Sequence, residues 1–281
     1  MKKIAMIGAG SMAEALISGM VKNQLLEPSN IWVTNRSNQE KLQELKNTYG
    51  VSTSYQLQEL CQDADAIILA MKPKDALNAL VTIKDLLQSQ TVIISVLAGV
   101  SINSIERILT KPMAIVRAMP NTSATIGKSA TALACNEHVS TNQSVMVEQI
   151  FQTVGLSKFV KEEQLDAVTG LSGSGPAYVY YIFEAMEKSA IELGLEKELV
   201  KDLIIQTFLG AAEMLSTTTK SAGQLRKEVT SPGGTTEAGL QTLADHGVEQ
   251  ALISCIKEAA AQSKRLGEAI SHEMESKVVK R

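Results

Sequence analysis

The segment Gly8-Ala9-Gly10-Ser11-Met12-Ala13 constrains the fold of this chain more than any other feature. It has the form G-x-G-x-x-A and lies between an apolar run at 3–7 and a segment, 11–21, with apolar residues at helical spacing. In that strand–turn–helix setting the first glycine permits a tight turn, the second lets the backbone approach a pyrophosphate, and the alanine keeps the helix close to the sheet. The free N–H groups of the helix start favour phosphate. Residues 8–12 are therefore predicted to bind a dinucleotide, with a turn selected only for packing as the alternative.

The rest of the first half alternates β-branched runs with helical patterns. This alternation predicts a Rossmann-like, parallel, doubly wound sheet with right-handed crossovers. The candidate strands are 31–34, 66–70, 91–95 and 114–118, and the candidate helices are 39–49, the segment after Pro73, and 102–109.

The second half changes character from about residue 161, where strand-like runs give way to long helical patterns. The candidate helices are 166–193, 197–215, 237–246 and 249–270, and we expect the polar tail 271–281 to be frayed. We therefore predict a dinucleotide-binding α/β domain over 1–160 and an all-α dimerisation and substrate domain over 161–281. The stretch 177–191 is apolar on most of its circumference, so it must be buried on several sides. A homodimer at least is expected, and a larger ring of dimers is left open.

The end of the second candidate strand indicates which dinucleotide is bound. A site for NAD usually places Asp or Glu there to accept from the ribose 2′-hydroxyl. This chain has Asn35-Arg36-Ser37 instead. Arg36 can pair with a 2′-phosphate, and its neighbours can donate hydrogen bonds. The prediction is NADP, with NADPH preferred and NADH left open; a solvated arginine in a loop is the alternative.

Three further loops follow strands at the edge of the sheet where ligands bind in such folds. The first is Ala70-Met71-Lys72-Pro73, in which the proline restricts Lys72 to extended geometry. The second contains Ala98-Gly99, and the third contains Asn121. We predict that these residues contact the cofactor; an exposed lysine and an asparagine that caps a turn are the alternatives.

Two glycine-rich turns punctuate the helical half. The turn at 171–176 is typical of close packing between helices, with a part in the substrate site as the alternative. The segment 228–237 contains Ser231, Gly233, Gly234, Thr235 and Thr236, which offer hydroxyls and consecutive N–H groups at a helix start. Such a segment can hold a small carboxylate, with a plain helix cap as the alternative.

Composition excludes several other classes. Across 281 residues the formal net charge is −3, which favours neither nucleic acid nor an anionic membrane. The three cysteines are far apart and form no C-x-x-C pair, so neither disulfides nor a metal site is predicted. No segment approaches the roughly 18 apolar residues that span a bilayer, and the N-terminal apolar run is too short for a signal peptide. We expect a cytoplasmic protein.

Over nearly its whole length the chain resembles pyrroline-5-carboxylate reductases. The resemblance rests on six motifs in the family's order: GAGSMAEA at the start, AMKP at 70–73, LAG at 97–99, RAMPNTSA at 117–124, DAVTGLSGSGPAYVYY at 166–181 and VTSPGGTTEAGL at 229–240. It implies reduction of 1-pyrroline-5-carboxylate to L-proline by NADPH, the last step of proline synthesis, in an interlocked dimer.

The resemblance also implies roles for individual residues. The substrate carboxylate is expected on Ser231 and the N–H groups of Thr235 and Thr236, with Gly233 and Gly234 in the same turn. The Thr236 hydroxyl is expected near the ring nitrogen, and Glu162 is expected to approach the substrate. We predict Thr236 and Lys72 as the catalytic residues. The sequence departs from the family near Leu57, where many relatives have Asn, and at Glu228 and Thr235.

Two other functions remain compatible with these patterns. One is an NADP-linked dehydrogenase of small hydroxy acids, for which Lys188 on a helix of the second half could donate the proton. The segment 228–237 would then be unexplained. The other is a non-catalytic NADP-binding module.

Overall fold

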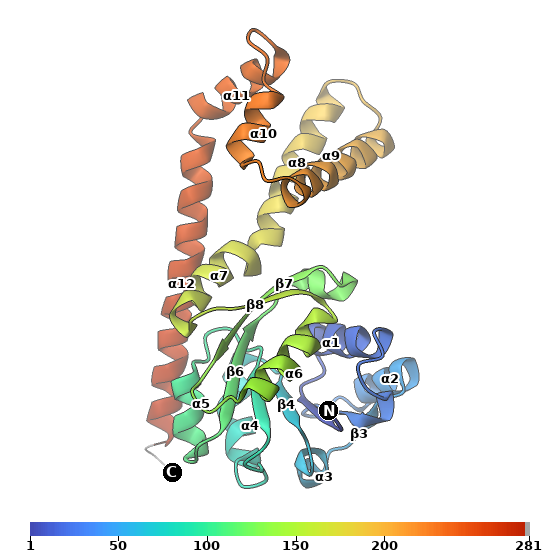
Figure 1. The fold of residues 1–281 in the computed structure, drawn as a ribbon, viewed down its shortest axis with the longest axis vertical. Coiled ribbons are helices and arrows are strands. Elements are labelled where there is room, and N and C mark those ends of the chain that lie inside the picture. Colours follow the sequence, from blue (N-terminus) through green and yellow to red (C-terminus); the bar gives the residue numbers. More distant parts are fainter. Residues whose placement is uncertain (279–281) are drawn as a thin grey trace. The chain divides into compact units, whose positions relative to one another are not determined.

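The computed structural model describes residues 1–278, which divide into two compact units (Figure 1). Unit 1 is Met1–Ser174 together with the described chain from Glu258 on, and unit 2 is Gly175–Lys257. The last helix, α12 (Val248–Val278), therefore begins in unit 2 and ends in unit 1. The functional boundary predicted between residues 160 and 161 stays a prediction.

Unit 1 is built on an eight-stranded sheet. The strands lie in the order β3 (Ser52–Thr53), β2 (Ile31–Thr34), β1 (Ile4–Ile7), β4 (Ala66–Leu69), β5 (Val92–Ser95), β6 (Ala114–Met119), β7 (Ser129–Cys135) and β8 (Gly155–Phe159). The five predicted strands are confirmed, and the first six run parallel in the doubly wound order. In such a sheet the strand order reverses between β1 and β4, which opens a crevice at their carboxyl ends.

The central strands are apolar throughout because helices cover both faces of the sheet. Consecutive residues of a strand point to opposite faces. Thus Ile4 and Met6 enter one buried cluster with α1 (Ser11–Lys22) and α6 (Thr141–Gln152), whereas Ala5 and Ile7 enter a second one with α4 (Ala76–Ile83) and α5 (Ile102–Leu109). The remaining helices of this part are α2 (Gln39–Tyr49) and α3 (Leu57–Cys61).

One part of the sheet differs from the prediction. β7 pairs antiparallel with β6, so the sheet is mixed rather than wholly parallel. The connection between them holds only a 3-10 turn, Thr122–Ile126, and Gly127 in the left-handed region at φ 72°. A parallel crossover needs about a dozen residues or more, and this connection is shorter. β8 then pairs parallel with β7 and forms the edge of the sheet.

Unit 2 consists of helices. α8 (Gly175–Glu192), α9 (Lys197–Thr217), α10 (Ala222–Glu228) and α11 (Thr235–Asp245) precede the first part of α12. The predicted helix 166–193 is divided: α7 (Leu165–Val168) and the π-helical turn Thr169–Gly173 belong to unit 1, and α8 to unit 2. Many apolar residues of unit 2 remain exposed in the single chain; Tyr181 is 75% exposed and Leu193 is 80% exposed.

The end of α12 corrects the expectation of a frayed tail. Residues 271–278 continue the helix, and Met274 is buried in the cluster formed by α4 and α5. Gly267 and Gly99 allow this packing, since a Cβ added at Gly99 would lie 3.1 Å from the Cα of Gly267. The rest of the predicted tail, 279–281, lies outside the described residues.

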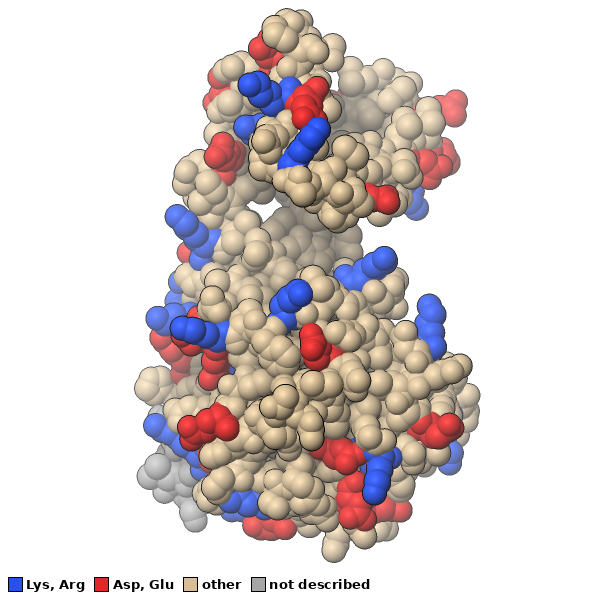
Figure 2. All heavy atoms as spheres, in the orientation of Figure 1, with Lys and Arg blue, Asp and Glu red and all other residues tan. Residues whose placement is uncertain are grey.

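Charged side chains of both signs are interspersed over the face shown in Figure 2, in keeping with the small net charge of −3. In the part of the chain that the structure describes, no helix combines the length and the apolar character that crossing a membrane requires.

Candidate functional site

A pocket of about 1050 Å³ lies in unit 1 at the carboxyl ends of β1, β2 and β4. This is the crevice where doubly wound sheets bind their ligands. The structure brings together here most of the predicted cofactor residues: Gly8, Ala9, Gly10, Ser11, Met12, Asn35, Arg36, Ser37, Ala70, Met71 and Lys72. Three separate loops thus meet as predicted, although their contact with a cofactor remains a prediction.

Gly8 fixes the turn that leaves β1. Its φ of +118° is one that side-chain-bearing residues rarely adopt. A Cβ at this position would lie 2.4 Å from the carbonyl carbon and oxygen of Ala70. The Gly8 N–H donates to the Thr34 carbonyl at 2.8 Å, which ties the turn to β2. Only glycine fits at this position, because the backbone of Gly8 lies so close to that of Ala70.

Gly10 is a different case. It precedes α1 as its N-cap, with φ −81° and ψ −178°, and a Cβ built on it meets no atom within 4 Å. The space beside Gly10 belongs to the pocket. α1 begins at Ser11, so its first N–H groups lie at the same place and suit a phosphate group. The geometry fits the pyrophosphate of a dinucleotide.

The ionisable residues that line the pocket are mostly cationic. They are Arg36, Lys41 and Lys72, against the single carboxylate of Asp75. Arg36 approaches Asp75 at 3.9 Å and its side chain is 90% exposed. Lys72 is exposed and extended, with φ −72° and ψ 142°, as expected before a proline. Because Lys41 is itself paired with Glu14 and Glu44, it is Arg36 and Lys72 that favour an anionic ligand here.

Lys41 is a pocket residue that sequence reasoning missed. Its ammonium donates to Glu14 at 2.8 Å and to Glu44 at 2.9 Å. The hydrogen bond with Glu14, followed by that with Glu44, raises the pKa of Lys41 above its usual value, so the side chain stays charged at neutral pH. A signal was present in the sequence: Lys41 follows the Asn35-Arg36-Ser37 segment closely and lies in the first turn of α2.

Asn35 shapes the loop beside these cations. Its amide nitrogen donates to the Asn38 carbonyl at 2.6 Å, and its oxygen accepts from the Asn38 N–H at 2.8 Å. The same oxygen accepts from the Tyr55 hydroxyl at 3.3 Å. Tyr55 and Leu57 also line the pocket, at the place where the sequence departs from the family. The Asn38 side chain in turn caps α2.

The other predicted cofactor residues lie elsewhere in unit 1. Pro73 begins the 3-10 turn that follows Lys72, Ala98 is exposed, and Gly99 packs on Gly267. None of these, nor Asn121, is among the described residues that line the pocket. Their cofactor contacts remain predictions.

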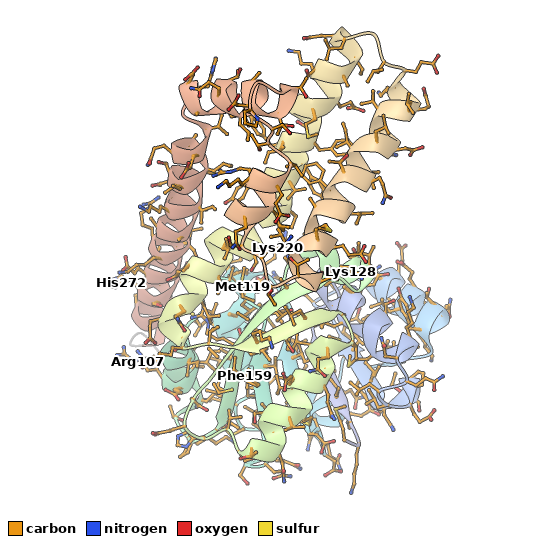
Figure 3. The ribbon with its side chains drawn as sticks, turned by 45° about the horizontal axis from the view of Figure 1, so that its top comes forward. Arg107, Met119, Lys128, Phe159, Lys220 and His272 are labelled. Carbon is orange, nitrogen blue, oxygen red and sulfur yellow. The ribbon has the colours of Figure 1, made fainter. Side chains whose placement is uncertain are left out.

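Asn121 joins two segments at the end of β6. It is 9% exposed, and its amide nitrogen donates to the Ser172 carbonyl of the π-helical turn at 3.0 Å. Its oxygen accepts from the Ser123 N–H at 3.2 Å. The neighbouring side chain of Met119, labelled in Figure 3, lies 3.0 Å from where a Cβ of Gly173 would stand. Gly173 thus permits close packing of the turn at 171–176, one of the two interpretations given above for that segment.

Glu162 makes two strong contacts within unit 1. Its Oε1 accepts from Arg117 on β6 at 2.7 Å and from the Ile102 N–H at the start of α5 at 2.8 Å. A pocket of about 300 Å³ lies beside Arg117, lined also by Gly99 and by His272, which is labelled in Figure 3. These contacts show Glu162 as a link between β6 and α5, and its substrate contact remains a prediction.

The predicted carboxylate-binding segment forms the entry to α11 in unit 2. Gly233 adopts φ +73°, and its N–H donates to the Glu237 carboxylate at 2.7 Å. The Gly234 N–H donates to the Ser231 carbonyl at 3.0 Å. α11 begins at Thr235, so the N–H groups of Thr235 and Thr236 belong to its first turn. The local geometry is that of a helix start led by a glycine cap.

The three cysteines, Cys61, Cys135 and Cys255, are free thiols. Burial raises the pKa of Cys61 to about 11 and shifts that of Cys135 in the same direction. Among the side chains that the structure describes, no His, Cys, Asp and Glu gather in a group of three or more that could hold a metal ion.

Comparison with known proteins covers both halves of the chain. Residues 162–266 match the family model for pyrroline-5-carboxylate reductase dimerisation, and residues 3–99 match that for NADP oxidoreductase, coenzyme F420-dependent. Pyrroline-5-carboxylate reductase 2 of Bacillus subtilis is 48% identical over 268 residues, which cover 95% of this chain and 96% of that protein. Pyrroline-5-carboxylate reductase 1 of the same organism is 47% identical over 96% of this chain and 91% of that protein.

Solved structures agree with the sequence comparisons. The pyrroline-5-carboxylate reductase of Coxiella burnetii is 39% identical, with a TM-score of 0.88 over 94% of this chain and 98% of that one. The Plasmodium falciparum pyrroline carboxylate reductase with NADP bound is 29% identical, with a TM-score of 0.85 over the same shares. The chain has a Rossmann unit that matches an NADP oxidoreductase model, followed by a helical dimerisation unit, and its relatives are nearly half identical over almost its full length. It therefore belongs to the pyrroline-5-carboxylate reductase family of oxidoreductases.

Proposed function

We propose that this protein reduces the ring C=N bond of 1-pyrroline-5-carboxylate with NADPH and so makes L-proline. The observation that carries the proposal is the pocket of unit 1, in which a glycine-rich turn and a helix start meet Arg36, Lys41 and Lys72. The relatives named pyrroline-5-carboxylate reductase support the choice of substrate.

The residues of the pocket fit a dinucleotide phosphate. The open space beside Gly10 leaves room for the pyrophosphate, and the first turn of α1 offers N–H donors to it. Arg36 and Ser37 would hold the ribose 2′-phosphate, and Lys72 would lie along the same pocket. When bound, NADPH supplies the hydride that reduces the imine carbon.

The entry to α11 would bind the substrate carboxylate. The N–H groups of Thr235 and Thr236 and the Ser231 hydroxyl are donors, and the helix start adds a partial positive charge. Gly233 and Gly234 let the backbone approach the small ligand closely. Glu237 accepts a hydrogen bond from the Gly233 N–H and thereby stabilises the turn before α11.

The proton required by the reduction would come with the substrate. A ring imine is readily protonated, whereas a threonine hydroxyl is too weak an acid to act alone at neutral pH. Thr236 would therefore act as a hydrogen-bond partner of the ring nitrogen. Lys72 is our second candidate for a catalytic role, as a cation beside the cofactor, and Glu162 for a contact to the substrate. The main contribution of the protein is alignment of the two reactants.

We further propose that the protein works as a homodimer in the cytoplasm. The dimerisation model matches residues 162–266, and many apolar side chains of unit 2 stay exposed in the single chain. A second copy would cover them, and light scattering would distinguish a dimer from a ring of dimers. Free thiols, among them the exposed Cys255, suit a reducing compartment.

One assay distinguishes the three candidate functions. We expect oxidation of NADPH, followed by its absorbance, when 1-pyrroline-5-carboxylate is added, with proline as the product. A dehydrogenase that relies on Lys188 would instead reduce a small keto acid and ignore the imine. Binding of NADPH without turnover of either substrate would indicate a non-catalytic module and overturn the proposal.

A further inference from the structure

Lys41 differs from the other cations of the pocket because two carboxylates bind its ammonium group. Its ammonium bonds Glu14 on α1 at 2.8 Å and Glu44 on its own helix at 2.9 Å. An ammonium group has three N–H donors. Two are used by the carboxylates, and Lys41 itself lines the pocket although Glu14 and Glu44 do not. The remaining donor is therefore available to a ligand in the pocket.

We infer that Lys41 is a second binding residue for the 2′-phosphate of NADPH, beside Arg36, and that it provides most of the discrimination against NADH. The inference rests on the proposed function and extends it by naming the residue that sets the cofactor preference.

Arg36 and Lys41 differ in how exposed they are and in how firmly other side chains hold them. The Arg36 side chain is 90% exposed and approaches Asp75 only at 3.9 Å, whereas that of Lys41 is 23% exposed. An exposed, unanchored side chain loses conformational freedom when it binds, and its attraction is screened by salt. Lys41 has already lost that freedom through its two ion pairs. A charge-assisted hydrogen bond from it consequently adds more to affinity than one from Arg36.

The neighbouring carboxylates fix the position of the Lys41 ammonium. Glu14 lies in the first turn of α1, where the helix dipole stabilises a negative charge. Its other oxygen accepts from the Tyr49 hydroxyl at 3.3 Å. These contacts hold the carboxylate behind the lysine, and they favour the charged form of Lys41 at the pH of the cell. Glu14 is in this sense a positioning residue for Lys41.

The test is the ratio of the Kd values for NADH and NADPH, measured by calorimetry on the full-length protein. Lys41→Met should lower this ratio by about tenfold or more, since one charge-assisted hydrogen bond is lost. NADH binding should change by no more than about twofold, because its ribose carries no phosphate. Lys46→Met is the matched control: Lys46 is exposed on the same helix outside the pocket, and its variant should keep the wild-type ratio.

Each outcome decides the matter. Should Lys41→Met bind NADPH with the wild-type preference, the inference is overturned while the proposed function stands. Should the wild-type protein bind neither dinucleotide, the proposed function falls, and the inference with it. If thermal unfolding shows that the single variant does not fold, the double variant Glu14→Gln, Lys41→Met removes both charges of the pair. The same drop in the ratio is expected from it, and an unchanged ratio refutes the role of Lys41.

Discussion

Adding a methyl group to either of two glycines in the turn after β1 is predicted to have different effects. Gly8→Ala should lower stability, whereas Gly10→Ala should weaken NADPH binding. Gly8→Ala places a Cβ 2.4 Å from backbone atoms of Ala70, where ordinary contact begins at 3.4 Å. The β1 turn and the loop after β4 must therefore separate by about 1 Å, an overpacking cost of about 1–3 kcal/mol. The φ of +118° adds about 1–3 kcal/mol for a residue with a side chain.

The expected loss of about 2–6 kcal/mol is large against the total stability of a domain, about 5–15 kcal/mol. Gly10→Ala should change stability by less than about 1 kcal/mol, because its φ is negative and its Cβ meets nothing. It should instead weaken NADPH binding, because the methyl group occupies the space that we assign to the pyrophosphate.

Urea unfolding followed by fluorescence measures the first effect. The single tryptophan, Trp32, lies on β2 next to β1, where it pairs with Ala5, so its emission reports on unit 1. Calorimetric titration with NADPH measures the second effect. The reasoning is refuted if Gly8→Ala unfolds at the wild-type urea concentration, or if Gly10→Ala binds NADPH as tightly as the wild type.

Three further predictions concern separate parts of the protein. Thr236→Ala should lower kcat/KM for the imine by about 10- to 100-fold, a typical loss for a group that assists proton transfer. The control Thr242→Ala, on the same helix, should leave kcat/KM unchanged. Near wild-type activity of Thr236→Ala would remove Thr236 from the mechanism. Arg36→Ala should raise the KM for NADPH more than that for NADH in steady-state kinetics, and an unchanged preference would contradict its assignment. Burial raises the pKa of Cys61 from 9.0 to about 11, so its thiol ionises first in the unfolded chain. The free energy of unfolding should consequently fall by about 2 kcal/mol as the pH rises from 9 to 11, and Cys61→Ala should lack this part of the loss.

The central strands that the sequence predicted are short runs made mostly of apolar residues. Segments such as 66–69 and 92–95 are continuous β-branched and apolar runs because helices cover them on each side. β7 escaped prediction because three of the seven residues of Ser129–Cys135 are alanines, which have weak strand preference. Its antiparallel pairing depends on the length of one connection, which an apolar pattern does not reveal.

Long-range contacts account for what the sequence left out. Residues 271–278 are polar enough to suggest a frayed end, yet Met274 and Gly267 dock this helix on unit 1. Lys41 went unnoticed because its partner Glu14 lies 27 residues earlier on another helix. The turn at 8–12 and the segment after β2 were found because each acts through a local pattern of glycines or charges.

The most direct test of the central claim is a structure of the assembled protein with NADPH and proline. Our account predicts the pyrophosphate beside Gly10, the 2′-phosphate at Arg36 and Lys41, and the proline carboxylate on the N–H groups of Thr235 and Thr236, within reach of the nicotinamide. A complex in which segment 229–240 of every subunit lies far from the dinucleotide would contradict it.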